Sequence, residues 1–247
     1  MTQTQIIMGM PITIEITHGG SQPIFDKVFN YFKKIDNRFS TYKSDSEISK
    51  INNGLEASRW SKSMKDVFKL CEQTKEITNG YFDIDHNGQL DPSGLVKGWA
   101  IDNAANILRK QGLKDFYVEA GGDIQVSGTN SEKKPWAIGI RNPFNINEVI
   151  KIVSLSNEGV ATSGTYIRGQ HIYNPKNKNQ KITEVKSLSV IAGNVYEADR
   201  FATAAFAMGR KGIKFIESIP GLEGYMVDDK KIATYTTGFE RYVIKNA

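Results

Sequence analysis

The sequence contains very little cysteine and histidine, which narrows the chemistry open to it. Cys71 is its one cysteine, so no disulfide can form within the chain. Cys71 falls on the apolar face of an expected helix, which favours a buried thiol over a nucleophile. The three histidines are dispersed, which argues against a zinc site. The Gly-x-Ser-x-Gly segment of serine hydrolases and the Walker A phosphate-binding segment are both absent.

Long hydrophobic runs are absent as well. No apolar stretch approaches the ~20 residues that a helix needs to cross a bilayer. Residues 1–7 have neither a basic leader nor a signal-type apolar segment. As it stands, the sequence predicts a cytoplasmic protein without a membrane span, or an exported and anchored one if a leader has been trimmed. No linker rich in Pro, Gly or Ser interrupts it, which predicts one domain over residues 1–247.

Positive charge exceeds negative charge modestly, by +5, and is scattered along the chain. The longest basic cluster, Lys176–Lys181, is broken by Asn and Gln, which is typical of a solvated loop. No basic–aromatic motif accompanies it, so we expect no nucleic-acid partner. A mild positive field does suit a small ligand that carries phosphate groups.

Hydrophobic spacing predicts helices and strands that are partly segregated along the chain, which favours an α+β fold. Helices are expected at Phe25–Phe39, from Ser61 to before Asn79, Lys97–Lys110, Glu197–Met208 and Ile213–Ser218, with a short helix or ordered loop at Asp45–Asn52. Strands are expected at Ile12–Ile16, Phe116–Ala120, Ile124–Ser127, Trp136–Ile140, Ile150–Leu155, Gly159–Thr162, Tyr166–Ile172 and Leu188–Ala192, with two more near the C-terminus.

The segment Glu197–Gly209 carries the most informative pair of polar residues. Asp199 and Thr203 are four residues apart, so on a helix they lie on one face. A carboxylate and a hydroxyl in this arrangement suit a hard cation such as Mg²⁺, which prefers oxygen ligands. In the structural alternative, Asp199 stabilises the first helical turn through the helix dipole and Thr203 simply packs.

Three further segments contain candidate site residues. Gly94 and Gly98 flank Lys97 where a loop enters an expected helix, and this can present backbone groups and one cation to a phosphate. An ordinary turn and helix start is the alternative. The Glu119–Ile124 segment favours a glycine hairpin between two strands. The segment 161–175 gathers hydroxyl groups, an arginine and a histidine, and a structural role for that histidine stays open.

Taken together and in order, these segments resemble the ApbE family of FAD:protein FMN transferases. The resemblance covers nearly the whole chain, and its motifs are collinear. The matching segments are Met8-Gly-Met-Pro11, Phe39–Asn52, Gly80–Asp83, Asp91–Ala100, Glu119–Asp123, Thr162–Gly164, His171–Pro175 and Asp199 with Thr203.

The resemblance implies a single ApbE-type, T-fold-like domain with mixed, mainly antiparallel sheets flanked by helices. It implies Mg²⁺-dependent transfer of the FMN moiety of FAD to a Ser or Thr hydroxyl of an acceptor protein, with release of AMP. Asp199, Thr203 and a backbone oxygen near Gly94 are then the implied magnesium ligands, and His171 and Asp199 the implied catalytic residues. His171 matches a family histidine that helps to deprotonate the acceptor. The implied flavin contacts are Met8, Tyr42, Tyr81, Phe82, Asp83, Asp91, Lys97 and Ile172.

The sequence departs from the family pattern at several places. Only residues 84–90 separate the Phe-Asp element from the next motif, where the family commonly has a longer stretch. This implies a shorter loop over the flavin and a more open acceptor groove. Asn174 and Glu119 stand where the family commonly has Asp and Asn. Arg200 replaces a usually small residue, and it either reaches a phosphate or points to solvent.

Two alternative functions stay open at this point. With water in place of the acceptor hydroxyl, the same site would be an FAD pyrophosphatase that gives FMN and AMP. A chain that kept the pocket but lost turnover would be a non-catalytic flavin-binding protein. The presence of both Asp199 and Thr203 argues against that second alternative.

Overall fold

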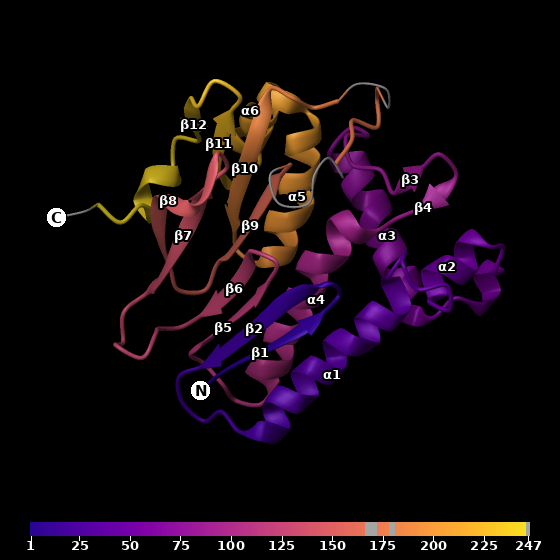
Figure 1. Ribbon diagram of the computed structural model, residues 1–247, viewed down its shortest axis with the longest axis horizontal. Helices are drawn as coiled ribbons and strands as arrows, with labels where there is room; N and C mark the ends of the chain where they lie inside the picture. The colour runs from indigo at the N-terminus through magenta and orange to yellow at the C-terminus, as the bar shows by residue number, and fades with distance from the viewer. Residues whose placement is uncertain (166–171, 178–180, 246–247) are drawn as a thin grey trace.

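An eight-stranded antiparallel sheet runs through the computed structural model of the chain, which describes residues 1–165, 172–177 and 181–245 (Figure 1). The strand order is β1-β2-β5-β6-β9-β10-β11-β12, and each neighbouring pair is antiparallel. The hairpins β3-β4 and β7-β8 lie outside this sheet. The strands are β1 (Thr2–Ile7), β2 (Met10–Ile16), β3 (Asp85–His86), β4 (Gln89–Leu90), β5 (Phe116–Ala120), β6 (Asp123–Ser127), β7 (Trp136–Asn142), β8 (Asn145–Leu155), β9 (Gly159–Gly164), β10 (Val185–Ala192), β11 (Glu223–Asp228) and β12 (Ala233–Tyr235).

Two helices, α4 and α5, lie side by side against the sheet (Figure 1). Helix α4 packs on β5 and β6, and α5 packs on β9 and β10, so the two halves of the sheet meet where these helices meet. The helices are α1 (Gln22–Phe39), α2 (Glu47–Asn52), α3 (Lys62–Ile77), α4 (Ser93–Lys110), α5 (Val195–Ala207) and α6 (Gly212–Ser218), with short 3₁₀ turns η1 (Ala57–Arg59), η2 (Gly209–Lys211) and η3 (Phe239–Tyr242).

Alternation along the strands divides the core between the two faces of the sheet. On β10, Val190 packs with α5, whereas its neighbour Ile191 packs with the hairpin β7-β8 on the other face. Helix α1 buries a continuous apolar face at helical spacing, as its sequence predicts. Cys71 is 1% exposed and burial raises the pKa of its thiol, so the expectation of a buried thiol is confirmed.

Local capping explains where the site-bearing helices begin and end. The Ser61 hydroxyl accepts a hydrogen bond from the Met64 amide at the start of α3. Helix α3 ends before Asn79 and Gly80, which both have positive φ. The Asn194 side chain caps α5 by accepting from the Glu197 amide. These signals confirm the expected limits of α3 and the expected helix at α5.

The start of α4 differs from the sequence prediction. The helix begins at Ser93, four residues before the expected start at Lys97. The Asp91 carboxylate accepts from the Ser93 amide, and the Pro92 carbonyl accepts from two amides of the first turn. Gly94 and Lys97 therefore lie within the helix, and not in a loop that enters it.

Other differences concern strands. Strand β1 was not expected from the sequence, and the hairpin β3-β4 lies inside a segment expected to be a loop. Strand β8 begins at Asn145 instead of Ile150. The strand expected at Tyr166–Ile172 lies outside the described residues except for Ile172, which is not in a strand. Within the described ranges, no helix is both long enough and apolar enough to span a bilayer.

Candidate active site

A cavity opens where α4 and α5 meet the end of the sheet. It brings together Tyr81, Phe82, Asp83, Asp91, Gly94, Lys97, Ile172, Asp199 and Thr203, all of them sequence-predicted site residues. Its other lining residues are His86, Ser93, Gly121, Thr162, Ser163, Gly164, Tyr173, Pro175 and Ala207. Segments that are far apart in the sequence thus share one concave site, as expected for a ligand pocket.

The contact between α4 and α5 places the expected metal-binding oxygens together. The Thr203 hydroxyl donates to the Gly94 carbonyl at 3.2 Å. The Gly98 amide donates to Asp199 Oδ2 at 2.7 Å. A Cβ at Gly98 would lie 2.5 Å from the Asp199 Cβ, so only glycine allows this approach. The hydrogen bond also means that the Gly98 amide serves Asp199, and not a phosphate as the sequence suggested.

Two buried carboxylates share the ammonium group of Lys97. Its Nζ lies 2.6 Å from Asp123 Oδ2 and 3.8 Å from Asp199 Oδ1. The Asp123 and Asp199 side chains are almost completely buried. Burial raises the pKa of Asp199 above its ordinary range, and the nearby Lys97 opposes part of that rise. Two carboxylates beside one ammonium favour the arrival of a further cation.

The donor set at this point fits Mg²⁺. Asp199, Thr203 and the Gly94 carbonyl offer a carboxylate, a hydroxyl and a carbonyl, which are the hard oxygen ligands that Mg²⁺ prefers. Mg²⁺ also keeps several waters and takes ligands from a phosphate substrate, so it needs few protein groups. Among the described residues no three His, Cys, Asp or Glu side chains gather as a group that could hold a metal ion.

The segment after α3 forms one wall of the cavity. The Phe82 amide donates to the buried Thr78 hydroxyl. Asp83 is paired with Lys75 at 2.9 Å. Lys176 Nζ lies over the Tyr81 ring, 4.6 Å from its centroid. These contacts hold an apolar and aromatic wall beside the charged floor of the site, which Lys97, Asp123 and Asp199 form.

A stacked aromatic pair extends this wall. The His86 ring on the hairpin β3-β4 stacks on Tyr173, with centroids 4.3 Å apart. The Tyr173 hydroxyl donates to the backbone carbonyls of Asp83 and Asp85 at 2.9 and 3.2 Å. Burial raises the pKa of Tyr173 to about 12, so the phenol stays protonated as a donor.

Two expected flavin contacts, Met8 and Tyr42, are not among the residues that line the cavity. Tyr42 is 98% exposed and does not line it. Met8 lies in the tight turn between β1 and β2, with positive φ, and packs partly against the core. His171, together with Arg168, lies outside the described residues.

Arg200 is buried and does not line the cavity, so the expectation that it points to solvent is wrong. Its guanidinium donates to the Thr74 hydroxyl at 3.0 Å and to Glu197 at 2.6 Å. It also lies over the rings of Tyr196 and Phe201. The residue is buried and joins α5 to α3.

Asp123, which pairs with Lys97, and the cavity residues His86 and Tyr173 were not expected as site residues. Asp123 follows two glycines in a segment that favoured a hairpin, and that hairpin is confirmed between β5 and β6. The signal for Asp123 in the sequence was an acidic residue directly after a glycine turn between two expected strands. His86 and Tyr173 are 87 positions apart, and no local pattern connects them.

A model of the ApbE family matches residues 8–88 and 84–226 of the chain. The chain belongs to the ApbE family. The match covers most of the elements that build the cavity, from the turn at Met8 to β11.

Curated ApbE-family relatives named FAD:protein FMN transferase match parts of the chain. The protein from Vibrio cholerae is 32% identical over 165 residues, which cover 62% of this chain and 47% of that protein. The protein from Haemophilus influenzae is 24% identical over an alignment of 254 positions, gaps included, which covers 76% of this chain and 73% of that protein. The chain thus spans about half the length of the first of these relatives.

Solved ApbE structures share the fold almost completely. The ApbE protein from Thermotoga maritima has a TM-score of 0.87 with 23% identity, and 99% of each chain is covered. The flavin transferase ApbE from Vibrio cholerae has a TM-score of 0.85 with 21% identity, and 98% of each chain is covered. The expected α+β fold of the ApbE type is confirmed.

Proposed function

We propose that this chain is an FAD:protein FMN transferase, which moves the FMN moiety of FAD to a Ser or Thr hydroxyl of an acceptor protein and releases AMP. The observation that carries the proposal is the convergence of Asp199, Thr203 and the Gly94 carbonyl beside Lys97 in one cavity. The curated relatives named FAD:protein FMN transferase support the same activity.

Asp199, Thr203 and the Gly94 carbonyl would hold the Mg²⁺ that the proposal requires. When bound, Mg²⁺ offsets the charge of a pyrophosphate and makes phosphorus more open to attack. Lys97 adds a fixed positive charge at the same place, since its Nζ lies between the two buried carboxylates. Lys97 and a bound cation together would offset the two carboxylates, so that a negatively charged pyrophosphate could bind at the junction of α4 and α5.

The wall of the cavity suits the ring systems of FAD. Tyr81, Phe82 and Ile172 offer apolar and aromatic surface next to the charged floor. A dinucleotide has planar rings on both sides of its pyrophosphate, so a site for it needs both kinds of surface. Positioning the pyrophosphate against the floor would align its riboflavin-side phosphorus for attack.

The chemical step breaks the phosphoanhydride bond of FAD and forms a phosphoester on the acceptor. The acceptor hydroxyl oxygen forms a bond to the phosphorus on the riboflavin side, and the bridging P–O bond of the pyrophosphate breaks. AMP leaves with the bonding electron pair, and the hydroxyl proton passes to a general base. We propose His171 for that base, on the strength of the family motif that it matches.

Incubation with FAD, Mg²⁺ and candidate acceptor proteins tests the proposal. We expect mass spectrometry to find the mass of FMN added to an acceptor, with one AMP released per modification. The Asp199→Asn variant should lose this activity, whereas Asp66→Asn, on the exposed face of α3, should keep it. Release of AMP and free FMN with a proven acceptor present would instead identify an FAD pyrophosphatase.

A further inference from the structure

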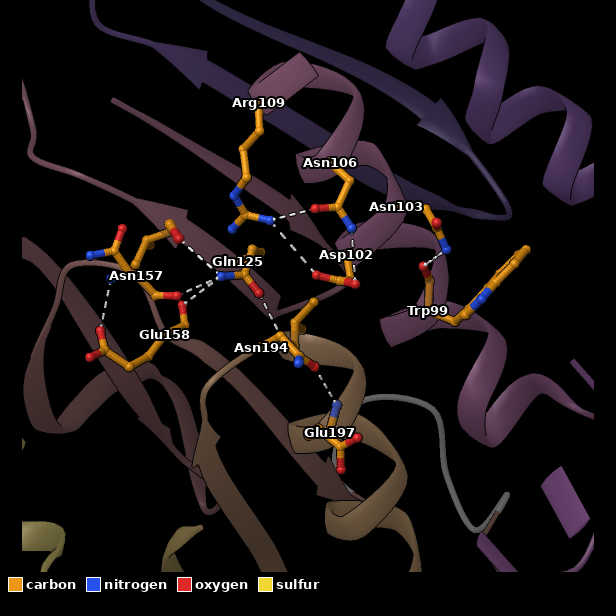
Figure 2. Close-up of polar contacts among 12 residues, drawn as sticks. Trp99, Asp102, Asn103, Asn106, Arg109, Gln125, Asn157, Glu158, Asn194 and Glu197 are labelled. Atoms are coloured by element: carbon orange, nitrogen blue, oxygen red, sulfur yellow. Dashed lines mark hydrogen bonds and ion pairs between the residues drawn. The ribbon is translucent and has the colours of Figure 1, made fainter. Parts of the chain in front are cut away.

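Gln125 lies outside the cavity but holds the start of the helix that carries Asp199 and Thr203. It is fully buried on β6. Its side-chain nitrogen donates to the carbonyls of Val126, Asn157 and Glu158 at 3.0, 3.0 and 3.2 Å. Its side-chain oxygen accepts from the Val195 amide at 2.8 Å. Figure 2 shows Gln125 between the turn at Asn157–Glu158 and the start of α5 at Asn194.

The side-chain oxygen of Gln125 accepts from a backbone amide that has no partner within helix α5. Val195 is the first residue of α5, and the first four amides of a helix have no partner within it. The Val195 residue is fully buried, so water cannot replace the partner. Loss of the Gln125 oxygen would leave a buried donor unsatisfied, which is costly.

Close backbone approaches make the position of α5 sensitive to this bond. A Cβ at Gly159, at the start of β9, would overlap the backbone of Val195. One at Gly98, on α4, would lie 2.7 Å from the Val195 carbonyl. The first turn of α5 therefore packs tightly against both β9 and α4, and Gln125 bonds the same turn to β6.

Asp199 lies about one turn beyond Val195 on this helix. A helix moves largely as a unit, so a shift at Val195 displaces the carboxylate and the hydroxyl of Thr203 together. The contacts at stake are the 2.7 Å bond from Gly98 to Asp199 and the 3.2 Å bond from Thr203 to Gly94.

We propose that Gln125 is a positioning residue, which sets the place of α5 and thereby the affinity of Asp199 and Thr203 for a divalent cation. This inference rests on the proposed function. Gln125 acts through the Val195 amide and touches neither the substrate nor the metal.

Two variants separate its acceptor bond from its donor bonds. In Gln125→Met the side chain has a similar shape but can form neither the acceptor bond nor the donor bonds. In Gln125→Glu a side-chain oxygen can still accept from the Val195 amide, whereas the donor bonds are lost. Asn106→Ala is the matched control, since Asn106 bonds Asp102 and Arg109 in the neighbouring network but not α5 (Figure 2).

Electron paramagnetic resonance measures the binding of Mn²⁺ in the absence of FAD. A residue that only stabilises the fold would not change this affinity in the folded protein. We expect Gln125→Met to bind Mn²⁺ about tenfold more weakly, which is typical when an outer partner of a metal ligand is lost. Gln125→Glu should lie closer to wild type, and Asn106→Ala should match it. Wild-type affinity in folded Gln125→Met would overturn the inference, as would equal weakening in the control.

Hydrogen exchange on the unaltered chain gives a second test that does not depend on a variant folding. If the Val195 bond supports metal binding, saturating Mn²⁺ must in turn slow exchange of the Val195 amide, because such coupling is reciprocal. An unchanged Val195 exchange rate at saturation would overturn the inference. If the wild-type chain binds no Mn²⁺ at all, the proposed metal site fails first, and the positioning role of Gln125 fails with it.

Discussion

At the scale of single residues, the Thr203 hydroxyl can be removed with little change to the packing around it. It donates to the Gly94 carbonyl, and the γ-methyl of Thr203 lies near the Gly94 backbone. Valine would keep the methyl contacts and lose the hydroxyl. The functional consequence can therefore be separated from packing.

We expect Thr203→Val to need much more Mg²⁺ for half-maximal AMP release, with activity about 10- to 100-fold lower at limiting metal. Its free energy of unfolding should change by only about 1 kcal/mol, the size of one hydrogen bond. A Mg²⁺ titration of AMP release measures the first quantity and urea unfolding the second. Thr203→Ser keeps the hydroxyl and should behave like wild type; an unchanged titration in Thr203→Val would remove Thr203 from the metal site.

Arg200 illustrates the opposite case, a charged residue next to the site with a structural role. Its guanidinium ties Glu197 to Thr74 between α5 and α3. We expect Arg200→Met to lower the free energy of unfolding by about 2 kcal/mol, through the lost charged hydrogen bonds. Turnover of the folded fraction should stay near wild type.

Urea unfolding and turnover per folded molecule measure the two effects of Arg200→Met. Arg210→Met is a suitable comparison, because the Arg210 side chain is 46% exposed where it pairs with the buried Asp228 and the exposed Asp229. Exposed pairs contribute about 0–1 kcal/mol, so this variant should lose less stability. A large loss of turnover without a loss of stability in Arg200→Met would show that Arg200 belongs to the active site.

At the scale of elements, the close packing of α4 on α5 is what brings the two charged segments together. Gly98 permits it, since a Cβ there would lie 2.5 Å from the Asp199 Cβ and 3.0 Å from its Oδ2. Alanine is otherwise well suited to a helix, so propensity alone would make Gly98→Ala stabilising. Helix packing and helix propensity therefore make opposite predictions at this position.

We expect packing to prevail and Gly98→Ala to lower the free energy of unfolding by about 1–3 kcal/mol, as overpacking does. Metal-dependent turnover should fall as well, because Asp199 loses its bond to the Gly98 amide. Gly193→Ala is the control, since nothing lies within 4 Å of a Cβ there. Thermal unfolding together with AMP release checks both effects, and a stabilised, active Gly98→Ala would contradict the role given to this contact.

At the scale of the whole molecule, the cavity joins elements from both halves of the chain. Residues 81–94 and α4 supply one side, and α5 with the end of β9 supplies the other. A ligand that binds only the folded chain stabilises it by mass action. Binding across this junction should therefore raise the resistance of the whole fold to heat.

We expect FAD with Mg²⁺ to raise the thermal midpoint, by the equivalent of about 2.7 kcal/mol when FAD is at a hundredfold excess over its Kd. FAD without the metal should give a smaller shift. Differential scanning calorimetry measures both, and Asp199→Asn should respond to FAD equally with and without Mg²⁺. A wild-type shift that ignores Mg²⁺ would argue against a metal-assisted pyrophosphate site.

Much of the fold could be predicted from the sequence because its causes are local. The apolar spacing of α1, the Ser61 cap of α3 and the Asn79-Gly80 stop each depend on residues a few positions apart. The start of α4 was placed four residues late, because the Asp91 and Pro92 contacts that begin it precede the apolar pattern. Strand β1 was missed because its alternation of Thr and Gln is polar.

Part of the candidate site could also be predicted, because Asp199 and Thr203 share a helical face and the family motifs are collinear. The sequence by itself thus determined the α+β class, the positions of most elements and the pair on α5. The tertiary structure decided the rest: Asp123 beside Lys97, the His86–Tyr173 stack, the inward course of Arg200 and the exposure of Tyr42. The physical reason is distance along the chain. The bond from Gly98 to Asp199 joins residues 101 positions apart, and only the packing of α4 and α5 on one sheet brings them together.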